Sequence, residues 1–250
     1  MKQFIAIPLL AVSAMTLSAC DGSIASAVGN AGKSSFKDGI AIGGSDSDPG
    51  KFDGVTLAGP DNVVFTTGAD FTIRAEGDAD VVEQLRYKVT EGQLKIGREY
   101  DGIWDGSTGS AIVYISAPSL ENAKLAGSGD MKVDSMTTES TKLSIAGAGN
   151  IQVAKVETAS LKTSIAGSGT LTMAGTAESA KISIAGSGDI SAKGLKADSA
   201  KISVAGSGDV ELSSDGSVDA KVAGSGDIRV YGDAKCTSKS AGSGDIKCGA

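Results

Sequence analysis

The chain has 250 residues, and its 30 acidic side chains outnumber its 23 basic ones to give a formal net charge of −7. This excess of negative charge argues against nucleic acid as a partner and against electrostatic adsorption to an anionic membrane. Histidine is absent from the sequence, which excludes Ser–His and Cys–His nucleophile pairs and removes the most common general base.

The N-terminus has the pattern of a bacterial export signal. Lys2 is followed by a mostly apolar run from Phe4 to Thr16, which is shorter than the roughly twenty residues of a transmembrane helix. The run ends in Leu17-Ser18-Ala19-Cys20, which resembles a bacterial lipobox, where the cysteine receives a diacylglyceryl group. We therefore predict a signal peptide over residues 1–19 and a lipid anchor on Cys20 that holds the protein to a membrane.

The lipid anchor would place the protein in the bacterial cell envelope. Asp21, directly after the cysteine, resembles the enterobacterial signal for retention in the inner membrane. The outer membrane, the periplasmic face, the inner membrane and the cell exterior therefore stay open as locations.

Beyond the anchor, the sequence predicts a linker and then one folded domain. Residues 20–50 are rich in glycine, serine, alanine and aspartate, and a flexible tether of this length spans roughly 30 Å. Residues 51–250 predict a β-solenoid, of which residues 51–120 form irregular N-terminal coils that cap its end. The strands expected there are Val55–Ala58, Asp70–Ala75, Tyr87–Thr90, Gln93–Gly97 and Ala111–Ser116.

Residues 121–250 contain a repeated motif, Ala-Gly-Ser-Gly-Asp followed by an apolar residue. Its copies and variants recur every 18 to 20 residues, at Ala126, Ala146, Ala166, Ala185, Ala205, Ala223 and Ala241. Such a period is typical of a stack in which each repeat forms one coil. Apolar and polar residues alternate within a repeat, which predicts strands, and the glycines permit a tight corner. The sequence therefore predicts an all-β solenoid with small aliphatic side chains between two close sheets.

Cys236 and Cys248 lie close together in the last repeat. Because disulfides persist in exported proteins, we predict that these cysteines pair, with two free thiols as the alternative. By loop entropy, such a bridge would contribute roughly 3 kcal/mol to stability.

Several segments of the sequence resemble a known family. They are Phe52-Asp53-Gly54-Val55, Gly92-Gln93-Leu94-Lys95-Ile96, Ile115-Ser116-Ala117-Pro118-Ser119-Leu120 and the Gly-Ser-Gly corners. With them, about residues 51–250 resemble the head GIN domain family, a domain of unknown function named for autotransporter adhesins. The resemblance implies a right-handed parallel β-helix similar in shape to pectin lyases, without their catalytic residues, and a role in adhesion.

Two rows of polar side chains are expected along the stack. One row follows the corners and contains Asp130, Asn150, Thr170, Asp189, Asp209, Asp227 and Asp245. These side chains accept hydrogen bonds from turn amides in one interpretation and bind a row of calcium ions in the other. The second row, Lys142, Lys162, Lys181 and Lys201, lies on the outward side, where charge balance and binding of sugar acids are the alternatives.

The segment from Gly97 to Ser110 is a candidate binding loop, with Arg98, Tyr100 and Trp104 as its binding residues. Exposed aromatic side chains on loops stack on sugars or anchor protein partners. The alternative is that Trp104 covers the first coil as a hydrophobic lid.

The remaining motifs do not indicate catalysis. The Gly-x-Gly motifs lack both the third glycine of a dinucleotide fingerprint and the Gly-Lys-Ser/Thr of a P-loop, so we predict no cofactor, no metal and no catalytic residue. We expect a non-catalytic, lipid-anchored envelope protein with adhesin-like binding of a protein or glycan. A structural or scaffold lipoprotein is the alternative, followed by a polysaccharide-acting enzyme.

Overall fold

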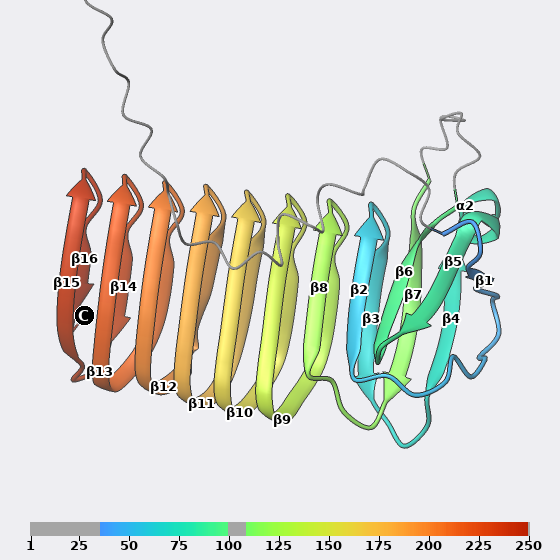
Figure 1. Cartoon of the computed structure of the whole chain (residues 1–250), viewed down its shortest axis with the longest axis horizontal. Coiled ribbons are helices and arrows are strands. Elements are labelled where there is room, and N and C mark those ends of the chain that lie inside the picture. Colours follow the sequence, from blue (N-terminus) through green and yellow to red (C-terminus); the bar gives the residue numbers. More distant parts are fainter. Residues whose placement is uncertain (1–35, 100–108, 250) are drawn as a thin grey trace, which may run out of the picture.

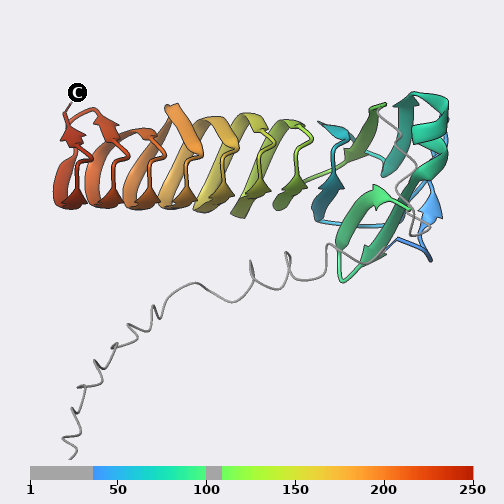
Figure 2. The same cartoon turned by 90° about the horizontal axis from the view of Figure 1, so that it is seen from above.

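The computed structural model describes residues 36–99 and 109–249. These residues form a β-solenoid of about six turns, mostly of parallel strands, with a smaller antiparallel part at the N-terminal end. Figure 1 shows the coils side by side along the long axis, and Figure 2 shows the same row from above with the N-terminal part at one end. The predicted all-β solenoid is confirmed.

The regular coils pair in the register that the repeats predict. The long strands are β9 (Met131–Gly147), β10 (Ile151–Gly167), β11 (Thr170–Gly186), β12 (Asp189–Gly206) and β13 (Val210–Gly224). Each pairs in parallel with the next, so that Ala146, Ala166, Ala185, Ala205 and Ala223 lie in one row across the stack. The stack ends with β14 (Ile228–Tyr231), β15 (Lys235–Gly242) and β16 (Ile246–Cys248), which lie on β13 and β14.

Buried side chains alternate along each coil formed by β9 to β12, but in these coils the alternation is interrupted three times. In β10 the first interruption follows Val153, the second follows Thr158, and the third lies at the Gly-Ser-Gly corner. The chain therefore bends at three places in each coil, and the predicted pair of close sheets is wrong. The interior is filled by aliphatic residues such as Ile165, Ile184 and Val204, which fit the narrow space between three runs of backbone.

The corner glycines are required by close approach of successive backbones. Gly167 has a φ of +132°, a conformation that disfavours any residue with a Cβ atom. A Cβ at this position would lie 2.2 Å from the carbonyl oxygen of Gly147 in the preceding coil. Ser168, next in the corner, donates its backbone N–H to that same carbonyl at 2.9 Å.

The first coils do not follow the order of the chain. β2 (Gly54–Gly59) lies between β6 (Gln93–Arg98) and β8 (Asn122–Gly127), and it is parallel to both. In the same way, β3 (Asn62–Thr67) lies between β7 (Ala111–Ala117) and β9. In the stack, the coil made of β6 and β7 therefore comes before the coil made of β2 and β3. In the sequence the order is reversed, because β2 and β3 come first.

An antiparallel cap closes this end of the solenoid (Figure 1). β5 (Leu85–Thr90) pairs with β6, and β4 (Thr72–Gly77) pairs with β7, both antiparallel. A short helix, α2 (Ala79–Gln84), connects β4 to β5. The five strands predicted in this region are present, whereas β3, α2 and the antiparallel pairings were not predicted.

The linker predicted over residues 20–50 extends too far. β1 (Ile40–Ala41) pairs antiparallel with β5, and both Phe36 and Ile42 are buried. The Phe36 ring lies over Gly97, where a Cβ atom would meet it at 2.3 Å. The folded domain therefore includes residues 36–50, because Phe36 and Ile42 are apolar side chains of this segment that pack against the cap.

Candidate functional site

The predicted lysine row is the most regular charged feature of the solenoid. Lys142, Lys162, Lys181 and Lys201 pair with one another in register through β9 to β12, which places neighbours about 4.8 Å apart along the stack. Lys142, Lys181 and Lys201 are exposed. None of these three forms an ion pair with a described residue. The row therefore presents closely spaced positive charge to the solvent.

More lysines extend this outward face beyond the predicted row. Lys124 in β8, Lys221 in β13 and Lys239 in β15 share the face, and all belong to one row with the serines of the intervening coils. Asp219 continues the predicted lysine row in β13 and lies 3.4 Å from Lys221. A chain with a net charge of −7 thus carries one predominantly basic face.

A row of serines runs parallel to the lysines, one bend earlier in each coil. Its members Ser160, Ser179, Ser199 and Ser217 pair in register. The sequence contains the signal for this row, because each serine stands two residues before the lysine or aspartate of its repeat. Sequence reasoning missed it because serine is frequent throughout the solenoid.

The serines and lysines flank a groove of about 510 Å³ that crosses strands β10 to β13 and reaches β15. Between the two rows lie Leu161, Ala180, Ala200 and Val218, which border the groove but are buried and belong to the core. The groove, here called the serine–lysine groove, combines hydroxyl groups and ammonium groups along the solenoid axis.

An acidic groove lies on the other side of the serine bend. It has a volume of about 660 Å³ and contains Glu139, Glu157, Glu178, Asp198 and Lys196 among its lining residues. Within the described part of the chain, no group of three or more Asp, Glu, Cys or His side chains is arranged to hold a metal ion. The acidic groove therefore does not have the geometry of a cation site.

One exposed ion pair borders this acidic groove. Lys196 Nζ lies 2.6 Å from Asp215 Oδ2. The hydrogen bond from Lys196 lowers the pKa of Asp215, and the same hydrogen bond raises the pKa of Lys196. Because the pKa of Asp215 is lower in the folded state, the pair is intact above the ordinary carboxyl pKa and is lost as the pH falls through the lowered value.

The row that follows the corners is built by hydrogen bonds between coils. A side-chain oxygen of one member accepts the backbone N–H of the next at 2.8 to 3.1 Å, as in Asn150 to Asp130, Thr170 to Asn150, Asp209 to Asp189, Asp227 to Asp209 and Asp245 to Asp227. At Thr170 the pattern changes, because Asp189 donates its N–H to the carbonyl of Gly169. The interpretation as acceptors of turn amides therefore holds for Asp130, Asn150, Asp189, Asp209 and Asp227, and it fails for Thr170.

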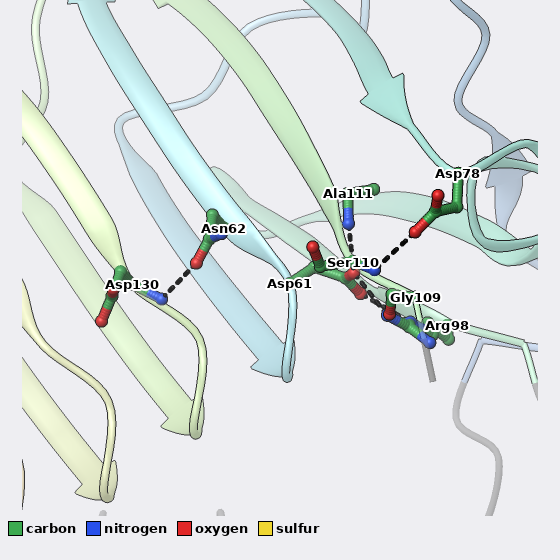
Figure 3. A network of polar contacts seen from close by, with 8 residues as sticks. All are labelled: Asp61, Asn62, Asp78, Arg98, Gly109, Ser110, Ala111 and Asp130. Carbon is green, nitrogen blue, oxygen red and sulfur yellow. Dashed lines mark hydrogen bonds and ion pairs between the residues drawn. The ribbon is translucent and has the colours of Figure 1, made fainter. Parts of the chain in front are cut away.

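The proposed role of Arg98 in a binding loop is wrong. Arg98 is the last residue of β6, and its guanidinium is 2% exposed beside Asp61, which is fully buried. The two groups form a double contact, with Nε to Oδ2 at 2.8 Å and Nη2 to Oδ1 at 2.7 Å. Figure 3 shows this pair together with the Ala111 N–H that Asp61 also accepts. The prediction failed because Arg98 ends a strand and faces a buried carboxylate, instead of standing in an exposed loop.

The buried pair connects the two out-of-order coils. Asp61 lies in the turn between β2 and β3, whereas Arg98 and Ala111 flank the connection from β6 to β7. Arg98 also donates to the Gly109 carbonyl at 2.9 Å. Asn62, directly after Asp61, accepts the N–H of Asp130 in the next coil and so begins the row of hydrogen bonds that follows the corners (Figure 3).

The other predicted site residues divide into two groups. Cys20, Tyr100 and Trp104 lie outside the described residues. Cys236 and Cys248 are joined by a disulfide with a Cα–Cα distance of 6.5 Å. This bridge connects β15 to β16 and closes the last coil on itself.

These features define a β-solenoid protein whose surface consists of rows of equivalent side chains, with grooves along the axis. The chain belongs to the family described as "Putative auto-transporter adhesin, head GIN domain", whose model matches residues 51–234. No curated protein shows significant similarity to the chain. Among the described residues, no helix is long and apolar enough to cross a membrane.

Solved structures share the fold. A "putative adhesin" from Bacteroides fragilis superposes with a TM-score of 0.72 at 23% identity, covering 82% of this chain and 95% of that one. A "putative adhesin" from Parabacteroides distasonis gives 0.66 at 20% identity, with coverages of 83% and 99%. A "putative lipid binding protein" from the same species gives 0.62 at 22% identity, with coverages of 82% and 95%.

Proposed function

We propose that the protein is a non-catalytic, lipid-anchored component of the bacterial cell envelope that binds a protein or glycan in the manner of an adhesin. The observation that carries this proposal is the repetition of outward side chains in register over successive coils. A repeated row offers the same contact many times, so weak contacts add up to firm attachment to a repetitive ligand. Membership of an adhesin-named family supports the same class of function.

The arrangement of polar residues favours binding over catalysis. Catalytic sites combine a nucleophile or a base with an orienting partner in a concave site. In the described residues, the buried charged pair of Arg98 and Asp61 connects two coils, and the grooves are lined by residues that repeat from coil to coil. A row of identical groups supplies attachment points and does not single out one reacting position.

The lipid anchor is tested by the variant Cys20→Ala. Because the apolar run before Cys20 stays attached when the cysteine is not lipidated, the measurement is the lipid itself: we expect incorporation of labelled palmitate into the wild-type protein and none into the variant. The matched control is the double variant Cys236→Ala/Cys248→Ala, which removes thiols far from the anchor and is expected to keep the label. Cys20→Ala protein that incorporates palmitate would contradict the anchor.

A further inference from the structure

We propose that the serine–lysine groove binds a linear polyanionic glycan built of uronic acids, which lies along the solenoid axis. This inference rests on the proposed binding function and names its ligand class and surface. The groove runs across strands β10 to β13 and onto β15, so a chain-like ligand meets equivalent groups in every coil.

The charge of the groove indicates an anion. Two unit charges about 4 Å apart in water repel each other by about 1 kcal/mol, and the lysines of the row start from backbones only about 4.8 Å apart in neighbouring coils. Folding does not require lysine at this position, because Thr237 occupies it in β15 and Asp219 in β13. A bound row of carboxylates would replace the repulsion between neighbouring lysines by attraction.

The other groups of the groove fit a sugar. Hydroxyl groups of Ser160, Ser179 and Ser199 line one wall and are able to exchange hydrogen bonds with sugar hydroxyls. A linear uronic acid chain carries one carboxylate on every sugar, so a chain that lies along the axis presents anions to successive coils.

The groove also discriminates against other ligand shapes. A single anion would contact one or two lysines and gain little at exposed positions. A chain that spans several coils gains at each of them, because the later contacts are intramolecular. The affinity for oligomers is therefore expected to rise with length until the oligomer spans the groove.

The experiment is a titration of the purified full-length mature lipoprotein in detergent with oligogalacturonates of increasing length, with malto-oligosaccharides as the uncharged comparison. We expect binding of the oligogalacturonates alone, with an affinity that falls as salt is added. The double variant Lys181→Glu/Lys201→Glu is expected to bind at least about 10-fold more weakly, because two attractions become repulsions. Both lysines are exposed, so the variant retains the fold, which circular dichroism would verify.

The matched control is Lys132→Glu/Lys247→Glu, which makes the same change in net charge at exposed positions outside the groove. It is expected to bind like the wild type. The proposal is overturned if the wild type does not bind oligogalacturonate, if monomer and oligomer bind equally, or if the control variant loses as much affinity as the groove variant. If the proposal fails in one of these ways, attachment of the wild type to surfaces coated with protein or with a neutral glycan would be measured next. Attachment to such a surface would still support the proposed binding function.

Discussion

Replacing Asp61 by alanine is expected to destabilise the protein by about 3–5 kcal/mol, because it leaves a buried guanidinium without its counter-charge. The Arg98 side chain is 2% exposed and makes two contacts to Asp61. The same change removes the acceptor of the Ala111 N–H. Urea unfolding followed by far-UV circular dichroism would measure the loss.

Two further variants test whether the loss of stability is specific to the buried pair or follows the removal of any charged side chain. Lys155→Ala removes one partner of an exposed pair with Glu157, and a cost of about 0–1 kcal/mol is expected. Asp61→Leu/Arg98→Met replaces both charges by apolar groups and should recover much of the loss. The role given to the pair would be refuted by an Asp61→Ala variant as stable as Lys155→Ala.

Gly167→Ala is the second substitution with a large expected effect, of about 3 kcal/mol or more. Part of the cost arises from φ, which is +132° at this residue. The rest arises from the new methyl group, which would lie 2.2 Å from the Gly147 carbonyl oxygen and force apart two stacked coils. Thermal unfolding of the variant would show a lower midpoint.

The neighbouring substitution Ser168→Ala is the control for the corner. Ser168 is exposed, and its contribution to the contact between coils comes from its backbone N–H, which alanine keeps. We expect a change within about 0.5 kcal/mol. Equal destabilisation by Gly167→Ala and Ser168→Ala would contradict the close approach of the backbones as the reason for glycine.

The regular coils could be predicted from the sequence because their contacts repeat. A period of 18 to 20 residues fixes which residues pair, so the lysine row and the row that follows the corners could be placed in register before the structure was known. The serine row follows from the same period. The groove beside it could not be recognised from the sequence, because its depth depends on where each coil bends.

The N-terminal part could not be predicted in the same way. The insertion of β2 and β3 between later strands is a long-range pairing without any repeat to indicate it. Arg98 pairs with Asp61, which lies 37 residues earlier in the chain. The residues around Asp61 do not distinguish it from the other aspartates of the sequence. Phe36 and Ile42 stand in a segment whose composition is that of a linker, so their burial depends on the cap alone.

The central claim is that this solenoid binds a protein or glycan as an adhesin does, which requires exposure on the cell surface, and protease treatment of intact cells tests that exposure most directly. Cells that produce the protein would be treated with protease, fractionated and blotted for the chain, with a periplasmic protein as the control for intact outer membranes. The proposed adhesin-like function predicts that the signal is lost from intact cells while the periplasmic control survives. Protection of the solenoid until the outer membrane is opened would contradict adhesion and favour a scaffold role in the periplasm.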